Sequence, residues 1–237
     1  MPSNLRMNKT NFVFKGERAR VKNSTCKVRD WLASLAIPTR HKLCPARIPS
    51  DFAENGKTKR WQEFLLGREC AESQLHALGE YSAVEVNEDR SPAWPQGFVG
   101  SISHSNKWVW ASVARDSDLR SLGIDTEIVT DAETADQIRS EIATEKEWTI
   151  TAATGLNPYQ QFSVVFSAKE AFYKCWYPIN PRYFSFTDAV VAAASDQQLQ
   201  IQTAHSNPNF GANPTELNVH FLVNKNDVFT ITWMEHK

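Results

Sequence analysis

The sequence predicts an α+β fold, because helix-forming and strand-forming segments occur in separate runs instead of alternating one by one. A long helical segment comes first, strands with a polar turn follow, then further helices and a final run of strands. Alternating apolar and polar residues mark the strands, whereas apolar residues at helical spacing mark the helices. The 237 residues are enough for one large domain or two smaller halves around a substantial core.

The first clear element is a helix predicted to begin near Thr58, in TKRWQEFLLGRECAESQLHALG. Gly79 at its end is typical of a helix C-terminus, where glycine readily adopts a left-handed backbone. Residues 100–114 are rich in Trp and Val and predict a strand. The polar run RDSDLRS then turns the chain, and we expect LGIDTEIV to pair with the preceding strand as a hairpin.

The second half of the chain continues with one or two helices predicted over residues 132–149. The segment NPYQQFSVVFSAKEAFYKCWYP predicts a long helix that Pro178 ends, since proline disrupts helical hydrogen bonding. Strand-like runs such as LNVHFLV and VFTITW fill residues 183–237. Strands therefore close the α+β pattern.

Charge and composition exclude several classes of protein. The formal net charge of −1 gives no overall basic field for nucleic acid, so any anionic ligand must be held by local clusters. No apolar run approaches the roughly 20 residues of a membrane span, and the N-terminus lacks the apolar core of a secretory signal. The four cysteines are widely spaced, so we expect reduced thiols, no zinc site and a cytoplasmic location. They are Cys26, Cys44, Cys70 and Cys175.

The first group of candidate residues lies on the helix after Thr58, where a set of residues shares one face by its spacing. The set is Arg60, Phe64, Arg68, Ala71, Leu75 and Leu78. An arginine in such a stripe can simply extend its head to water or to an acid. It can equally hold an anion, because a guanidinium group matches the geometry of phosphate oxygens.

The second group is the acid pair in the strand LGIDTEI. Because side chains alternate along a strand, Asp125 and Glu127 point to one side, about 7 Å apart. Such acids fit the solvated face of an amphipathic strand. With a third oxygen ligand they also fit a Mg²⁺ site, since Mg²⁺ takes few carboxylates and completes its shell with water and phosphate.

The third group lies in FSAKEAFYK. Glu170 and Lys174 are four residues apart, so they share a helical face and can form an ordinary surface ion pair. Lys169 falls within the apolar stripe, where an unpaired ammonium group is costly, so it needs a partner anion. His104, between two serines in GSISHS, sits at a predicted strand end, although a lone histidine is more often structural than catalytic.

Taken together, these residues resemble the signature of the 4′-phosphopantetheinyl transferases of the surfactin-synthetase-activating type, especially the enterobactin-synthetase component D branch. The matching segments run from Lys59 to Lys174 and are KR followed by GR, WPQGFVGSISH, GIDTE, TEKEW with Glu147, and FSAKEAFYK. Residues 1–55 contain no motif that we place in the family pattern. Thr126 stands where the branch more often has Ile or Val; it faces away from the acids, so we expect only a change in packing.

The resemblance implies two α/β halves related by a pseudo-twofold axis, with the active site in the cleft between them. Residues 1–119 would bind the phosphates of coenzyme A, and residues 120–237 would carry the metal and catalytic residues. The implied ligands of Mg²⁺ are Asp125, Glu127 and Glu170. The residues implied to contact coenzyme A are Arg60, Arg68, Ser103, His104, Lys169 and Lys174, with Lys59 as a further candidate.

The implied reaction transfers 4′-phosphopantetheine from coenzyme A to a serine of an apo carrier protein, giving holo-carrier and 3′,5′-ADP. Glu170 would act as the base toward the serine, and Lys174 would neutralise or protonate the leaving diphosphate. The expected acceptor is a peptidyl or aryl carrier of a nonribosomal peptide or siderophore synthetase. The carrier would contact Phe98, Trp108, Trp110 or residues 130–150. We expect a monomer that binds neither nucleic acid nor a membrane.

Two other functions fit the same residues. Another Mg²⁺-dependent enzyme, such as a phosphohydrolase, would use the three acids without a protein acceptor. A catalytically silent module would bind coenzyme A or a carrier protein only. The presence of both Glu170 and Lys174 argues against the silent module, because binding alone does not need a base.

Overall fold

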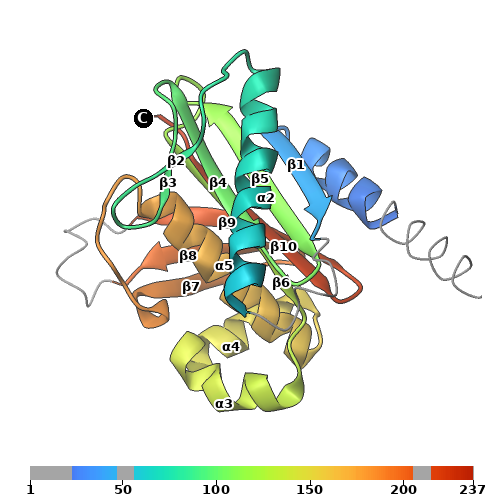
Figure 1. The fold of residues 1–237 in the computed structure, drawn as a ribbon. Coiled ribbons are helices and arrows are strands. Elements are labelled where there is room, and N and C mark those ends of the chain that lie inside the picture. The colour runs from blue at the N-terminus through green and yellow to red at the C-terminus, as the bar shows by residue number, and fades with distance from the viewer. Residues whose placement is uncertain (1–22, 47–55, 205–214, 237) are drawn as a thin grey trace, which may run out of the picture. The chain divides into compact units, whose positions relative to one another are not determined.

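The computed structural model describes residues 23–46, 56–204 and 215–236 (Figure 1). The chain divides into two compact units, residues 1–37 and residues 38–237. In the first unit, residues 23–34 are helical. Every other element described below belongs to the second unit. The division expected between residues 119 and 120 stays a prediction.

The N-terminal part of the second unit is a three-stranded antiparallel sheet in the order β1-β5-β4, which we call the N-terminal sheet. Its strands are β1 (Arg40–Pro45), β4 (Phe98–His104) and β5 (Trp108–Arg115). Helix α2 (Gly56–Ala77) packs against this sheet (Figure 1). The helix predicted after Thr58 is confirmed, and Gly79 beyond its end has a φ of 86°. A short ribbon of β2 (Glu85–Val86) and β3 (Pro92–Ala93) leads from α2 to β4.

The strand predicted over residues 100–114 is in fact a hairpin of β4 and β5. The side chain of Ser105 ends the first strand, because its Oγ accepts the backbone N–H groups of Lys107 and Trp108 at 3.4 and 3.2 Å. A serine that bonds the backbone two and three residues on is a local turn device that competes with the strand ladder. The apolar residues on both sides hid this turn from the sequence pattern.

The C-terminal part is a five-stranded antiparallel sheet in the order β6-β10-β9-β8-β7, which we call the C-terminal sheet. Its strands are β6 (Ser121–Ile128), β7 (Ala189–Ala194), β8 (Gln198–Thr203), β9 (Glu216–Asn224) and β10 (Asp227–Met234). Helices α3 (Ala132–Ile142) and α4 (Glu145–Thr151) connect β6 to α5 (Pro158–Trp176). These helices confirm the prediction over residues 132–149 and the long helix before Pro178.

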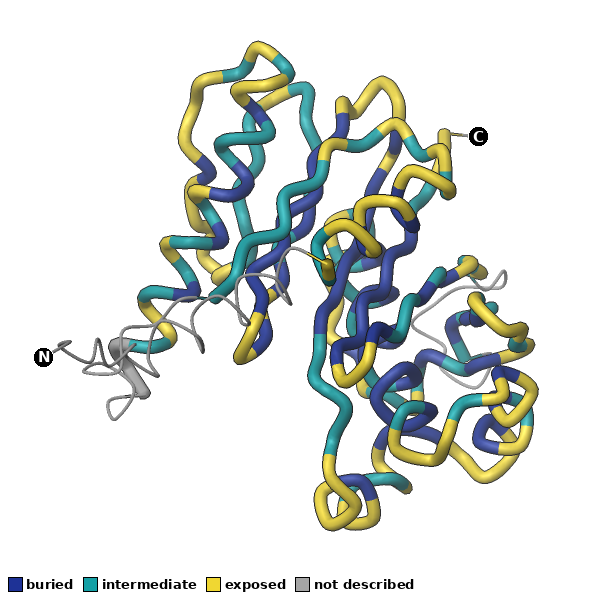
Figure 2. Tube along the Cα trace, turned by 90° about the vertical axis from the view of Figure 1, so that its right-hand side faces the viewer, coloured by how far each residue is buried: buried dark blue, intermediate teal, exposed yellow. Residues whose placement is uncertain are grey.

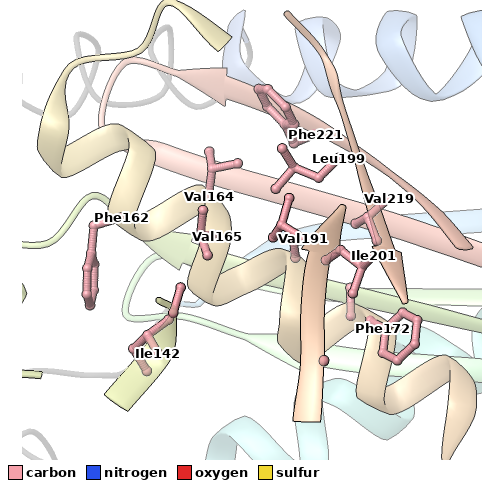
Figure 3. Packing of buried hydrophobic residues seen from close by; sticks show 14 of the residues in the cluster. Ile142, Phe162, Val164, Val165, Phe172, Val191, Leu199, Ile201, Val219 and Phe221 are labelled. Carbon is pink, nitrogen blue, oxygen red and sulfur yellow. The ribbon is translucent and has the colours of Figure 1, made fainter. Parts of the chain in front are cut away.

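Helix α5 lies along the C-terminal sheet and forms its main core with strands β7 to β9. Figure 3 shows Phe172 of α5 beside Ile201 of the sheet, and Leu199 beside Phe221, all of them buried. The helix begins at a well-defined cap, because Oδ1 of Asn157 accepts the N–H groups of Tyr159 and Gln160. Burial and capping together fix where α5 runs across the sheet.

Strand β6 does not pair with β5, so the hairpin predicted for LGIDTEIV is wrong. It pairs with β10 instead, with Asp125 opposite Thr230. The other edge of β6 meets β4 through serine side chains. Ser101 Oγ accepts the N–H of Ile124 at 3.1 Å, and Ser103 Oγ accepts the N–H of Thr126 at 3.2 Å. These hydroxyl groups satisfy edge amides of β6 that a neighbouring strand would otherwise bond.

A second contact between the two sheets is aromatic. The rings of Trp108 and Trp110 in β5 lie 6.2 and 6.0 Å, centroid to centroid, from Phe229 in β10. All three side chains are buried. Figure 2 shows the buried residues running along strands and helices, with exposed residues concentrated in the connecting segments. The seam between the sheets is therefore part of the protein interior.

The close approach of α5 to β6 depends on Gly123. A Cβ atom at this position would lie 2.0 Å from the carbonyl oxygen of Ala171 and 2.6 Å from the backbone nitrogen of Cys175. Both atoms belong to the backbone of the α5 helix and cannot rotate away. Glycine therefore lets the helix that carries Glu170 and Lys174 lie directly on the strand that carries Asp125.

We predict that Gly123→Ala destabilises the protein by about 3 kcal/mol, the upper end of typical overpacking costs, because the contact with backbone forces the helix away from the strand. Urea unfolding followed by circular dichroism measures the change. Gly67→Ala in α2 is the matched control, since its nearest neighbour is a side-chain methyl group of Ile102 at 2.7 Å. The control should lose less stability; an equal loss in the two variants would contradict the account of Gly123.

Candidate active site

The carboxylate of Asp125 is the centre of the candidate site. It is only 3% exposed, which excludes the solvated strand face as its environment. Its Oδ1 atom accepts hydrogen bonds from Ser103 Oγ and Lys174 Nζ, both at 2.7 Å. Its Oδ2 atom accepts a hydrogen bond from Ser167 Oγ, also at 2.7 Å. Asp125 therefore joins strand β6 to strand β4 and to helix α5.

The serine at position 167 was missed by the sequence analysis, although it lies within the FSAKE segment. Its hydroxyl group bonds Asp125 and lies 2.9 Å from the hydroxyl group of Thr230 on β10. The hydroxyl groups of Ser103 and Ser167, together with the ammonium group of Lys174, satisfy a carboxylate that would otherwise be costly to bury. The only signal in the sequence was a small polar residue on the buried side of a helix, which is too common to interpret.

Glu127 and Glu170 lie near Asp125 and are only partly buried. Burial, the charge of Asp125 and the charge of Glu170 raise the pKa of Glu127 to about 7, against the opposing effect of Lys174. Burial and Asp125 also raise the pKa of Glu170, again opposed by Lys174. Three carboxyl groups thus share one region with Lys174, and their mutual repulsion is incompletely balanced. Such a surplus of negative charge suits a bound cation.

The residue types at this site fit Mg²⁺, which prefers carboxylate oxygens and keeps water or phosphate in its remaining positions. Among the residues that the structure describes, no three His, Cys, Asp or Glu side chains are arranged to hold a metal ion. The ammonium group of Lys174 instead contacts the Oδ1 atom of Asp125. A magnesium site formed by Asp125, Glu127 and Glu170 therefore stays a prediction.

Lys174 pairs with Asp125 across the helix–strand contact, instead of with Glu170 one turn away as its spacing suggested. Its Nζ atom also donates to Ser103 Oγ at 3.2 Å. Burial alone would lower the pKa of Lys174, but the carboxylates of Asp125 and Glu170 raise it above its usual value. The lysine is therefore held fully charged beside the acids.

His104 lies at the end of β4, next to a buried acid of α2. Its side chain is 44% exposed, and its Nδ1 atom lies 3.6 Å from Oε2 of Glu63. Burial lowers the pKa of His104, whereas Glu63 opposes this shift. Lys59 lies 3.8 Å from the other oxygen of Glu63 and also bonds the side chain of Asn106. Glu63 thus holds two basic groups together, and the sequence analysis gave it no role.

The two arginines of the α2 stripe have different surroundings. Arg60 is exposed, and its positive charge further lowers the pKa of His104. These two basic groups therefore lie in the same part of the candidate site. The guanidinium group of Arg68 lies 3.6 Å above the ring of Phe64. Its Nε and Nη2 atoms are buried and have no hydrogen-bond partner among the described residues. The charged groups that act on Arg68 are Glu72 and Glu85, so the structure does not bring it to His104.

Ser103 and Lys169 are engaged within the protein, so the structure does not present them to a ligand. Ser103 is buried and bonds Thr126, Asp125 and Lys174 as described above. Lys169 is 1% exposed, and its Nζ atom lies 2.7 Å from Oε1 of Glu147. It also donates to the carbonyl oxygens of Ile142 and Phe186. The prediction that Lys169 needs a partner anion is confirmed, and that anion is Glu147.

The Glu147–Lys169 pair organises the segment between β6 and α5. Oε2 of Glu147 accepts the N–H of Thr144, which completes the N-terminal cap of α4. Its Oε1 atom accepts the N–H of Val191 on β7 at 3.0 Å. Burial alone would raise the pKa of Glu147, but Lys169 beside it lowers the pKa below its usual value. The pair therefore ties α4 and β7 to α5 and is structural.

Two residues expected to contact a carrier protein cannot do so in this structure. Trp108 and Trp110 are buried between the sheets, whereas Phe98 is partly exposed. Within residues 130–150, helix α3 presents several exposed side chains. Thr126 is fully buried, as its proposed packing role requires, and its hydroxyl group has no hydrogen-bond partner among the described residues.

Comparison with known proteins decides the family of this chain. The model of the 4′-phosphopantetheinyl transferase N-terminal domain matches residues 49–114, and the model of the 4′-phosphopantetheinyl transferase superfamily matches residues 121–231. The 4′-phosphopantetheinyl transferase PptT of Mycobacterium tuberculosis is 34% identical over 167 residues, which cover 65% of this chain and 67% of the relative. The chain belongs to the 4′-phosphopantetheinyl transferase superfamily. The α+β architecture agrees with this assignment.

Two further relatives are similar to this chain over shorter regions. The 4′-phosphopantetheinyl transferase Npt of Nocardia iowensis is 35% identical over 132 residues, covering 55% of this chain and 58% of the relative. Enterobactin synthase component D of Salmonella typhi is 32% identical over 126 residues, covering 53% of this chain and 52% of the relative. The matched regions thus span between about half and two thirds of these superfamily members.

A separate observation concerns membranes. Within the described parts of the chain, none of the helices has the length and apolar character needed to cross a bilayer.

We predict that Lys169→Met lowers the free energy of unfolding by about 3 to 5 kcal/mol, because it leaves the buried carboxylate of Glu147 unpaired. Urea unfolding measures the loss. The double variant Lys169→Met/Glu147→Gln removes both charges and should recover part of it. A single variant whose free energy of unfolding stays within about 1 kcal/mol of the wild type, roughly a fivefold change in the unfolding equilibrium constant, would contradict the structural role of the pair.

Proposed function

We propose that this protein transfers 4′-phosphopantetheine from coenzyme A to a serine of an apo carrier protein, releasing 3′,5′-ADP in a Mg²⁺-dependent reaction. The observation that carries the proposal is the group formed by Asp125, Glu127, Glu170 and Lys174 where β4, β6 and α5 meet. Membership in the superfamily supports it, as does the similarity to the 4′-phosphopantetheinyl transferases Npt and PptT.

The chemistry fits this arrangement, because phosphoryl transfer relies mainly on positioning and on neutralising charge. In the proposed reaction the serine oxygen bonds the β-phosphorus of coenzyme A, and the bond from that phosphorus to the leaving 3′,5′-ADP breaks. The chemistry that Mg²⁺ would supply is polarisation of the diphosphate and stabilisation of charge on the leaving oxygen. Asp125, Glu127 and Glu170 are the residues that would hold it.

Glu170 and Lys174 have separate roles in this proposal. The carboxylate of Glu170 is partly exposed and accepts the proton that the serine hydroxyl group loses as its oxygen bonds phosphorus. The ammonium group of Lys174, held ready by Asp125 and Ser103, offsets the negative charge that develops on the diphosphate. The raised pKa of Lys174 keeps that charge in place at neutral pH.

The basic group beside His104 supports a phosphate contact on the donor. His104, Arg60 and Lys59 come from β4 and α2, and Glu63 opposes the fall in the pKa of His104 that burial causes. We assign the 3′-phosphate of coenzyme A to this basic group. Glu63 is a positioning residue in this assignment, because it acts through its two basic neighbours.

The proposed acceptor is a peptidyl or aryl carrier domain of a nonribosomal peptide or siderophore synthetase. The similarity to enterobactin synthase component D of Salmonella typhi supports this choice. We further propose that the protein acts in the cytoplasm as a monomer, where coenzyme A and newly made carrier domains are available.

The proposal predicts that an apo peptidyl or aryl carrier protein, incubated with coenzyme A and Mg²⁺, gains the mass of phosphopantetheine. The gain should disappear with EDTA, and Glu170→Gln should abolish it, because the serine then lacks its proton acceptor. Intact-mass spectrometry measures the conversion. Glu69→Gln, at an exposed position of α2, is the matched control and should retain full activity.

Other outcomes of this assay point to the other functions. Near-normal conversion by Glu170→Gln would remove this residue from the base role. Failure to modify peptidyl, aryl and acyl carriers, despite measurable coenzyme A binding, would favour the silent binding module. Release of phosphate from phosphoesters without a carrier would favour the phosphohydrolase.

A further inference from the structure

Cys44 and Cys70 are 26 positions apart in the sequence but adjacent in the fold. Cys44 lies on β1, Cys70 lies on α2, and the Cys70 thiol donates to the sulfur of Cys44 over 3.1 Å between the two Sγ atoms. This separation is only about 1 Å longer than a disulfide bond. The cysteines are free thiols, as expected, but their spacing in the sequence did not predict this contact.

The two thiols have different environments. Cys44 is partly exposed, whereas Cys70 is 2% exposed. The hydrogen bond from Cys70 lowers the pKa of Cys44 to about 7, with help from the charge of Lys42 and against the effect of burial. The same hydrogen bond and burial raise the pKa of Cys70. Cys44 is thus the more exposed and more acidic of the two cysteines, and its sulfur contacts that of Cys70.

We propose that Cys44 and Cys70 form an oxidisable dithiol site, which reacts with small peroxides or disulfides and closes to a disulfide between β1 and α2. The proposal rests on the contact between the sulfur atoms and on their unequal access to solvent. It goes beyond the transferase function and does not depend on it.

The reaction with a peroxide takes two balanced steps. The Cys44 thiolate attacks one oxygen of hydrogen peroxide, the O–O bond breaks, and sulfenic acid and hydroxide form. The Cys70 sulfur then attacks the Cys44 sulfur, the S–O bond breaks, and water leaves with the proton of the Cys70 thiol. Sulfur is oxidised and peroxide is reduced. With glutathione disulfide, two successive exchanges give the same bond and release two glutathione thiols.

The remaining cysteines lack this arrangement. Cys175 is fully buried, and burial raises its pKa to about 12, so it is a poor nucleophile. Cys26 is exposed and belongs to the other compact unit of the chain. Neither has another cysteine sulfur within hydrogen-bond distance among the described residues. Selective closure between Cys44 and Cys70 follows from this difference.

The proposed bond would fix α2 to the N-terminal sheet. Cys44 lies opposite Val109 on β5, and Val109 in turn lies opposite His104 on β4. Cys70 lies on the same helix as Glu63, two turns further along. A disulfide here would therefore restrain the helix that holds Glu63 against His104.

The test uses the full chain, first reduced and freed of reductant, then treated with hydrogen peroxide or glutathione disulfide. Remaining thiols are alkylated before intact-mass analysis and peptide mapping. We expect the protein to lose the mass of two hydrogen atoms, and one linked peptide pair to contain Cys44 and Cys70. Dithiothreitol should reverse both changes. The oxidised protein should also melt at a higher temperature than the reduced protein, because the link restricts the unfolded chain.

Variants separate this site from general thiol oxidation. Cys44→Ser and Cys70→Ser should each lose the link and the melting shift, whereas Cys26→Ser, the matched control at an exposed thiol, should keep both. If Cys70→Ser fails to fold, Cys44→Ser and the peptide map of the wild type still decide the question. A link through Cys26, or overoxidation of Cys44 without any link, would overturn the proposal.

Discussion

The hydrogen-bonded carboxylate of Asp125 is the contact on which the candidate site depends. A buried charge is stable only when its oxygens are satisfied, and here partners come from a neighbouring strand and from a helix. Meeting that requirement brings β4, β6 and α5 together. Gly123 allows α5 to pack closely on β6, because any larger residue would push the backbone of α5 away from the strand. The same contact that satisfies a buried acid therefore places Glu170 and Lys174 beside it.

The candidate site has more negative than positive charge, unlike the buried ion pair elsewhere in the interior. The Glu147–Lys169 pair is closed, because each charge has its counter-charge and its remaining hydrogen bonds. Around Asp125, by contrast, Glu127 and Glu170 are partly exposed, and their raised pKa values reflect neighbouring negative charge as well as burial. Unbalanced groups of this kind are typical of sites that complete their charge with a ligand. Two lysines of α5 thus have different roles: the buried Lys169 is structural, and the partly exposed Lys174 faces the candidate site.

Sequence patterns predicted the elements that depend on local signals. Helix α5 followed from its apolar spacing and from Pro178, and the need of Lys169 for a partner followed from its place in the apolar stripe. Long-range contacts left no such signal. The pairing of β6 with β10 joins segments about 100 residues apart, and the sulfur contact of Cys44 joins a strand to a helix. The family resemblance implied that Ser103 contacts coenzyme A, but its hydroxyl group is bonded to Asp125 and to the backbone of Thr126 on β6.

The central claim is that Asp125, together with Glu127 and Glu170, holds the Mg²⁺ that acts on the diphosphate of coenzyme A. The most direct measurement is calorimetric titration of coenzyme A into the wild type and into Asp125→Asn, each with and without Mg²⁺. Asparagine keeps the shape of the side chain but removes the charge. The account predicts that Mg²⁺ strengthens coenzyme A binding about tenfold or more in the wild type, equivalent to about 1.4 kcal/mol, and has no such effect in the variant. Equal strengthening by Mg²⁺ in a folded Asp125→Asn variant would contradict it.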